Sequence, residues 1–167
     1  KHVEGEMFDY VSNPEFLREG SAINDFLYPD RVVIGANDKA FKIIQDIYSP
    51  LKNAKDIIIK TSIETSEMIK YASNSFLALK ISYINEVANL CESTGADIMD
   101  VSKVIGMDHR ISDQFLNPGP GYGGSCFPKD LKSFLYLSKS FNTPMYTVEG
   151  AIKRNNNQKK RMVRKLL

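Results

Sequence analysis

The chain has 167 residues, of which 43% are hydrophobic and 25% charged, and its formal net charge is +2. This balance is typical of a globular chain that buries a core, and it excludes a wholly disordered protein. No apolar run approaches the roughly 20 residues that cross a bilayer, and the start lacks the residue order of a signal peptide. We therefore expect a cytoplasmic protein without a membrane partner.

The two cysteines, Cys91 and Cys126, are too few for a disulfide framework, and they lack the paired spacing of a zinc site. We interpret both as thiols and expect no metal centre. Basic residues gather after Glu149, but no aromatic residue is interleaved with them. This pattern favours a solvated helix face over a nucleic-acid surface.

The first sixty residues read as α/β. Strands are predicted at 8–11, 31–34 and 56–60, and a helix is predicted over 39–51. This is too little sheet to stand alone, and the chain begins without Met directly before a strand. We therefore expect that earlier strands of a parallel sheet precede this segment in a longer protein.

A long helical pattern follows over 64–93, after the N-cap candidates Thr61 and Ser62, and it stops at Gly95. Its apolar residues occupy more than one face, so we expect the helix to be buried on several sides. A second copy of the chain is the simplest cover. The pattern thus predicts a homodimer formed through the long helix.

A shorter helix is predicted over 97–105, ending at Gly106, and further helices at 128–140 and from about Tyr146 to the end. Pro128 suits the first position of its helix. Between the first and second of these helices, about twenty residues show no periodicity, and a loop that long is usually functional. The predicted fold class is mainly α, with a long central helix and packed shorter helices after a few α/β elements.

The loop contains a glycine-rich run in which Gly119, Gly121 and Gly124 match the letters of a dinucleotide-binding fingerprint. We interpret the match as spurious, because no strand precedes it and no βαβ unit surrounds it. Glycines instead let the backbone approach a bound ligand closely and place Cys126 at the end of the loop.

Cys126 is the predicted nucleophile. It lies just before the helix expected to begin at Pro128, where unpaired N–H groups and the helix dipole favour a thiolate, and Lys129 adds positive charge. A small buried hydrophobe is the usual alternative for a cysteine. We keep that interpretation for Cys91, which lies within the long helix beside Leu90.

Lys70 and Asn74 are four residues apart and share one face of the long helix. Together they could donate hydrogen bonds to an oxyanion or position a water molecule, although an exposed, salt-bridging lysine is the simpler alternative. Asp130, one turn beyond Cys126, could orient that lysine or the water. An acid in the first turn of a helix is also expected from the helix dipole alone.

Glu15 and Glu19 follow the strand predicted at 8–11. The carboxyl ends of parallel strands are where α/β folds place ligands. These two glutamates are therefore candidates for a general base and a cofactor contact, with solvated surface acids as the alternative.

Four stretches together resemble the nucleotide-sugar 6-dehydrogenases, the UDP-glucose/GDP-mannose dehydrogenase family. They are NPEFLREGSA, EMIKYASNSFLALKISYINE, GMDHRI and PGYGGSCFPKD, which occur in the family's order and cover most of the chain. The wording of GMDHRI and SCFPKD is more similar to the UDP-glucose branch than to the GDP-mannose or N-acetylmannosamine branches.

The resemblance implies two successive NAD-dependent oxidations that convert the 6-alcohol of UDP-glucose to an acid, a step toward UDP-glucuronate and polysaccharides. Cys126 would capture the aldehyde as a thiohemiacetal, a second hydride would leave to give a thioester, and water would hydrolyse it. Lys70 and Asn74 would stabilise the charged oxygen through Lys70 and a held water, Asp130 would support that network, and Glu15 would be the base in hydrolysis.

Binding residues are also implied. Glu19 and Lys129 match positions that approach NAD, and Arg110 matches an arginine that reaches the substrate of the neighbouring subunit, which makes dimerisation part of the active site. The expected nucleotide-sugar contacts are Phe16, Leu17, Arg110, Phe115, Asn117, Gly119, Gly121, Tyr122 and Gly123.

The resemblance further implies a helical dimerisation domain like that of 6-phosphogluconate dehydrogenase, preceded by the end of a Rossmann-type NAD domain. Residues 1–61 would be the end of the NAD domain, 62–145 the central dimerisation and catalytic domain, and 146–167 a helix leading into a nucleotide-sugar domain. We expect the remainder of both flanking domains to be missing, so that the isolated chain binds NAD poorly and turns nothing over.

Three alternatives remain at this point. The chain could belong to another nucleotide-sugar dehydrogenase, acting on GDP-mannose or a UDP-N-acetyl sugar, or it could be a non-catalytic helical dimerisation module. A cysteine hydrolase is less favoured, because His2 lies at the terminus and His109 adjoins Arg110, so neither offers a convincing Cys–His partnership.

Overall fold

The structure is a computed structural model that describes residues 7–51 and 54–167. The chain divides into two compact units, Lys1–Lys70 and Tyr71–Leu167, each of which is described by itself. Within the described residues, no helix is long and apolar enough to span a membrane.

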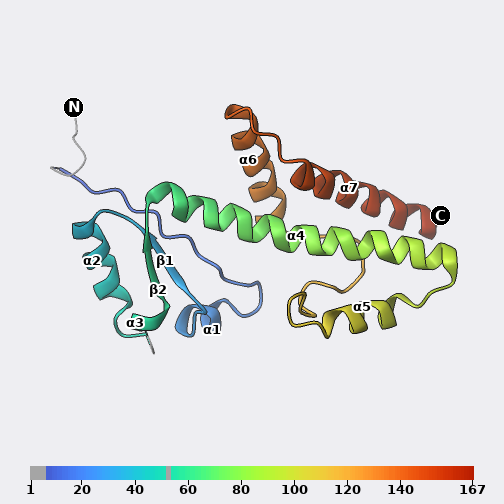
Figure 1. Ribbon diagram of the computed structural model, residues 1–167, viewed down its shortest axis with the longest axis horizontal. Helices are drawn as coiled ribbons and strands as arrows, with labels where there is room; N and C mark the ends of the chain where they lie inside the picture. The colour runs from blue at the N-terminus through green and yellow to red at the C-terminus, as the bar shows by residue number, and fades with distance from the viewer. Residues whose placement is uncertain (1–6, 52–53) are drawn as a thin grey trace. The chain divides into compact units, whose positions relative to one another are not determined.

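The first unit contains a parallel pair of strands (Figure 1). Strand β1 (Val32–Gly35) pairs with β2 (Ile58–Thr61), with Val32 opposite Ile58. Every residue of β1 is buried, as expected for an apolar strand of a parallel sheet. The strand predicted at 31–34 is therefore confirmed with a shift of one residue.

The strand predicted at 8–11 is wrong. Ser12 instead forms an isolated antiparallel bridge with Gly35, through N–H···O distances of 2.9 and 2.8 Å. Pro14 follows two residues later and has no N–H to extend a ladder. The chain here joins β1 through this bridge and through the Asn13 side chain, whose amide donates to the Val33 carbonyl at 2.8 Å.

The helices of the first unit agree in part with the sequence patterns. Helix α2 (Asp38–Tyr48) is capped by Asn37, whose side chain accepts from the Ala40 N–H, and it ends before the predicted limit because Pro50 cannot donate the next helical hydrogen bond. Helix α1 (Ala22–Leu27) was not predicted. The short helix α3 (Ala54–Ile57) takes up the start of the strand predicted at 56–60.

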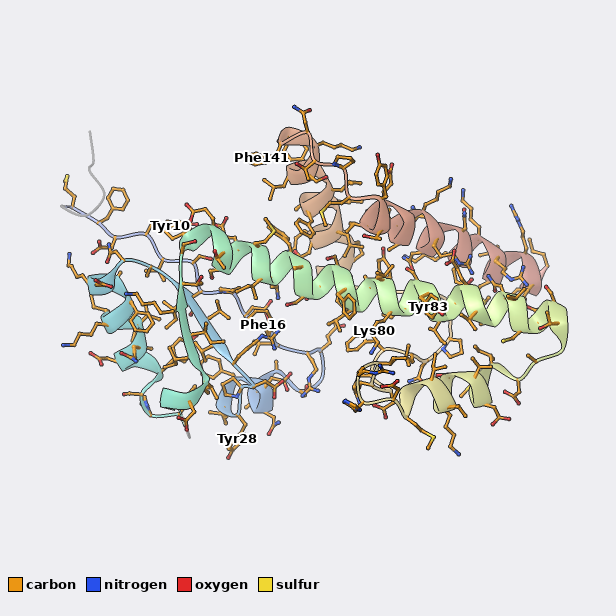
Figure 2. The ribbon with its side chains drawn as sticks, in the orientation of Figure 1. Tyr10, Phe16, Tyr28, Lys80, Tyr83 and Phe141 are labelled. Atoms are coloured by element: carbon orange, nitrogen blue, oxygen red, sulfur yellow. The ribbon has the colours of Figure 1, made fainter. Side chains whose placement is uncertain are left out.

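The predicted long helix is confirmed as α4 (Ile63–Thr94), which begins in the first unit and runs into the second. The predicted helix after it is also confirmed, as α5 (Ile98–Gly106), whose first turn is capped by Asp97. Burial of α4 on several sides by a second copy stays a prediction, and in the single chain Phe76, Tyr83 and Leu90 are 63%, 55% and 65% exposed. Figure 2 labels Tyr83 among them.

Two more helices complete the second unit, α6 (Cys126–Ser140) and α7 (Tyr146–Leu166), and α7 lies beside α4 (Figure 1). Helix α6 begins at Cys126, not at Pro128. A proline in third position is tolerated because the first turn's N–H groups have no intrahelical acceptor. The core of this unit is drawn from α4, α6, α7 and the loop before α6: Ala78, Tyr122, Leu131, Phe134, Val148 and Ala151.

Candidate functional site

In the first unit, Lys70 is held by Glu15. The Lys70 ammonium donates to the Glu15 carboxylate at 3.0 Å and to the Glu15 backbone carbonyl. The lysine side chain is only 18% exposed, against 55% for the glutamate. Lys70 thus forms the salt bridge that the simpler interpretation expected, with a side chain that is only partly exposed and is fixed beside a carboxylate.

Phe16 is part of the same cluster (Figure 2). The Lys70 ammonium lies 5.4 Å from the centre of the Phe16 ring, and the Arg31 guanidinium carbon lies 4.0 Å from it. Both contacts are cation–π interactions. The Leu17 N–H donates to the Glu15 carboxylate at 2.7 Å, so the segment 15–17 folds around the lysine. Glu19 is exposed.

In the second unit, Asn74 and Asp130 form a buried pair between α4 and α6. The Asn74 amide donates to an Asp130 carboxylate oxygen at 2.6 Å, and the two residues are 8% and 3% exposed. The other Asp130 oxygen accepts from the Lys129 ammonium at 3.1 Å. That hydrogen bond, helped by the charge of Asp130, raises the pKa of Lys129 above its usual value. Asp130 thus orients an amide and a lysine at the start of α6.

Cys126 is the first residue of α6 and is exposed. Cys91 is buried within α4, as expected of the small buried hydrophobe that it was interpreted to be. The Ser125 hydroxyl lies 3.7 Å from the Cys126 sulfur. The free N–H groups of the first turn and the positive end of the helix dipole meet at this cysteine. A thiol with this placement can attack an electrophile from solvent, because no apolar packing encloses it.

The loop before α6 is anchored along its length by side chains of α4 and α7. Near its start, the Lys80 ammonium donates to the carbonyls of Ile111 and Ser112 at 2.8 and 3.3 Å (Figure 2). Farther along, three buried amides that were not predicted as site residues bind its backbone; they are Asn85, Asn155 and Gln158.

Two of the predicted substrate contacts in this loop pack against Phe127 of α6. The rings of Phe115 and Tyr122 both meet the Phe127 ring edge-on, at centroid distances of 6.2 and 5.9 Å. Tyr122 is 5% exposed, and burial raises the pKa of its hydroxyl to about 12. The Tyr122 ring therefore belongs to the core, and a ligand could contact only the exposed neighbours of Tyr122 in the loop.

The remaining predicted contacts are on the surface. Asn117 and Gly123 are exposed, and Gly119 and Gly121 are partly buried. Arg110 is 78% exposed and pairs with Asp108 at 2.6 Å, a hydrogen bond that raises the pKa of the guanidinium and lowers that of the carboxyl. Within the described residues, no cluster of His, Cys, Asp and Glu side chains could hold a metal ion.

The first unit thus carries a parallel strand pair, and the helical second unit carries an exposed cysteine at the start of α6. Residues 1–52 match the NAD-binding domain of the UDP-glucose/GDP-mannose dehydrogenase family, and residues 64–157 match the family's central domain. The chain belongs to this family, which confirms the resemblance read from the sequence motifs.

Individual relatives agree. Over 97% of the present chain, the sequence is 52% identical to UDP-glucose 6-dehydrogenase of Rickettsia conorii. Over 96% of the present chain, it is 50% identical to UDP-glucose 6-dehydrogenase TuaD of Bacillus subtilis. It covers only 37% and 34% of those two proteins.

Solved structures give the same picture for the fold. A UDP-glucose dehydrogenase from Pyrobaculum islandicum superposes with a TM-score of 0.86 at 41% identity, over 92% of this chain and 35% of that one. GDP-mannose dehydrogenase from Pseudomonas aeruginosa gives 0.59 at 36% identity, again over 92% of this chain and 35% of that one. The mainly helical fold with a small parallel sheet is thereby confirmed.

Proposed function

We propose that the chain is part of an NAD-dependent UDP-glucose 6-dehydrogenase, which oxidises UDP-glucose to UDP-glucuronate in two hydride transfers through a covalent intermediate on Cys126. The observation that carries the proposal is the exposed cysteine at the first position of α6, directly after a glycine-rich loop. The names of the relatives supply the reaction. Because the chain spans little more than a third of their length, the activity is assigned to the protein that contains it.

Cofactor binding fits the first unit. Its two strands are parallel, so their carboxyl ends lie at one edge, which is where such folds bind dinucleotides. Glu19 in this unit has an exposed side chain. Lys129, the other residue proposed to approach the cofactor, belongs to the second unit, where its side chain is also exposed. When bound, NAD supplies the hydride acceptor for both oxidations.

The covalent steps are assigned to α6. The Cys126 sulfur adds to the aldehyde carbon to give a thiohemiacetal, which loses hydride to become a thioester. Water then breaks the C–S bond, releasing the acid and returning the thiol. Cys126 lies at the positive end of the α6 dipole, three residues before Lys129.

We assign to Lys70 and Asn74, which lie one turn apart on α4, the stabilisation of the negative charge that forms on the substrate oxygen. Asp130 accepts from the Asn74 amide nitrogen, which leaves the amide oxygen as an acceptor for a water molecule. Glu15 holds Lys70, and its carboxylate is the proposed base that takes a proton from the hydrolytic water. Each group is thereby fixed in orientation before a substrate arrives.

Dimerisation through α4 is part of the proposal. Three exposed apolar residues recur every seven positions along α4 and so form one stripe on it; they are Phe76, Tyr83 and Leu90. A second copy of the chain would cover this stripe. Arg110, exposed at the start of the loop, is proposed to reach the nucleotide-sugar bound by that second copy.

Activity of the complete reading frame tests the proposal. We expect NADH to form from UDP-glucose and NAD, in a ratio of two per sugar, and Cys126→Ala to abolish it, whereas Cys91→Ala preserves it. The isolated 167-residue chain is expected to give no NADH. Full turnover by the Cys126→Ala variant would reject the covalent route. Faster oxidation of GDP-mannose or a UDP-N-acetyl sugar would instead identify another branch of the family.

A further inference from the structure

Helix α7 holds the glycine-rich loop through side-chain amides that pair with its backbone. Asn155 accepts from the Tyr122 N–H at 2.8 Å and donates to the carbonyl of the same residue at 3.0 Å. One turn further along α7, Gln158 donates to the Gly119 carbonyl at 2.8 Å, and Asn85 of α4 accepts from the Gly119 N–H at 2.8 Å. Both loop residues therefore have their N–H and carbonyl groups satisfied by amides, as a neighbouring β-strand would satisfy them.

These amides are sealed from water. Asn85, Asn155 and Gln158 are 1%, 4% and 2% exposed, and Gln158 also donates to the Asn85 oxygen at 3.2 Å. A buried polar group that loses its partner is costly, so the loop backbone and the amides stabilise one another's positions. The loop cannot shift at Gly119 or Tyr122 without leaving a buried amide unpaired.

Gly121 is shaped by this arrangement. Its φ of +104° lies in the left-handed region, and a Cβ at this position would fall 2.3 Å from the Asn155 side-chain oxygen. A side chain at this position is excluded twice, by the backbone conformation and by the close approach of Asn155. The glycine therefore allows α7 to approach the loop backbone.

We propose that Asn155 and Gln158, with Asn85 as their support, are positioning residues that hold the loop over residues 117–123 in the shape that binds the substrate. The inference rests on the proposed function for the identity of that ligand, a nucleotide-sugar. None of the three amides needs to touch the ligand. Their effect is to fix a glycine-rich segment beforehand, so that binding does not have to order it.

Neighbouring asparagines provide a matched control. Asn156 and Asn157 follow Asn155 on α7, and both are exposed. Asn155→Ala and Asn156→Ala thus make the same chemical change on one helix, with and without loss of the loop contact. Asn155→Asp is the conservative variant, because it keeps an acceptor for the Tyr122 N–H and loses the donor to the Tyr122 carbonyl.

The first measurement is amide hydrogen exchange across residues 115–124 in the complete protein without ligand. We expect protected amides at Gly119 and Tyr122 in the parent and in Asn156→Ala. Exchange at Tyr122 should be at least about tenfold faster in Asn155→Ala and intermediate in Asn155→Asp, the tenfold corresponding to one lost hydrogen bond. Unchanged exchange in Asn155→Ala would overturn the inference, whatever the enzyme's substrate.

The second measurement separates positioning from general instability. In Asn155→Ala and Gln158→Leu we expect the KM for UDP-glucose to rise by about tenfold or more, with the KM for NAD and the kcat unchanged, whereas general instability would lower the kcat through loss of folded enzyme. Faster exchange with an unaltered KM for UDP-glucose would overturn the positioning role. If the parent enzyme oxidises no nucleotide-sugar, the proposed function fails, and the exchange data still decide whether α7 holds the loop.

Discussion

The buried pair of Asn74 and Asp130 makes a sharp prediction for stability. Replacing Asn74 by Ala removes the 2.6 Å hydrogen bond and leaves one oxygen of a 3%-exposed carboxylate without its amide. Hydrogen bonds to charged groups contribute about 1.5–3 kcal/mol, and an unsatisfied buried charge keeps its desolvation cost. The Lys129 ammonium remains on the other oxygen, so we place the loss near the middle of this range, at about 2 kcal/mol.

Thermal unfolding converts that value into a shift. For a unit of the size of Tyr71–Leu167, each 1 kcal/mol lowers the melting midpoint by roughly 4–8 °C, so Asn74→Ala should lower it by roughly 8–16 °C. Because the chain contains two compact units, the transition of the second unit should be followed locally, by hydrogen exchange of the α6 amides. Asn157→Ala, an exposed asparagine on α7, is the control and should change stability by no more than about 0.5 kcal/mol.

A double-mutant cycle decides whether the pair itself is responsible. Asp130→Ala alone should cost about as much as Asn74→Ala, and the double variant should cost clearly less than the sum of the two, since each single change orphans the other partner. The expected coupling is about 1.5–3 kcal/mol. Additive losses, with coupling below about 0.5 kcal/mol, would show that the two side chains do not depend on each other.

Three further predictions concern other parts of the chain. Gly35→Ala should destabilise the first unit by about 1–3 kcal/mol, because the new Cβ would lie 2.6 Å from the Ser62 carbonyl oxygen; an unchanged melting temperature would contradict this close approach. Iodoacetamide should label Cys126 well before Cys91 in the native protein, as judged by mass spectrometry of peptides, and equal rates would reject the difference in exposure. Hydrogen bonds from Lys165 and Arg161 of α7 hold the pKa of the Glu92 carboxyl below its usual value of 4.5. The stabilisation that these ion pairs give the folded state is therefore present above that pH and is lost as the pH falls through the lower, folded-state pKa. The hydrogen-exchange protection at the end of α7, taken relative to the intrinsic amide rate at each pH, should therefore fall in acid, and Glu92→Gln should lose this pH dependence; a variant that keeps it would point to another carboxylate.

Local patterns predicted much of the fold. The helical pattern over 64–93 and the glycine just beyond its end predicted α4, and α5 and α7 begin close to the predicted residues. The errors lie where the outcome depends on a partner far along the chain. The stretch 8–11 looked like a strand by composition, but it forms no described strand, and Ser12 just after it pairs with Gly35 in an isolated bridge.

The candidate site divides in the same way. Cys126 and the residues after it could be found because a cysteine, a glycine run and a helix start are adjacent in sequence. The contact between Lys70 and Glu15 joins residues 55 positions apart, and each had been named for its own local reason. Asn155 and Gln158 carried no local signal beyond two amides on the apolar side of a polar helix, so only the three-dimensional structure identifies them.

The use of side-chain amides to hold the glycine-rich loop has a physical reason. A glycine-rich loop has a large backbone entropy to lose, which makes its bound shape expensive unless something else orders it first. Side-chain amides are suited to that task, since one amide carries both a donor and an acceptor and can satisfy both backbone groups of one residue in a loop that has no neighbouring strand. Asn155 does so for Tyr122, while Gln158 shares Gly119 with Asn85. Because the amides act on backbone groups, the loop's own side chains remain free to vary with the ligand. Substitutions in α7 should therefore alter the affinity for that ligand without altering the chemistry at Cys126.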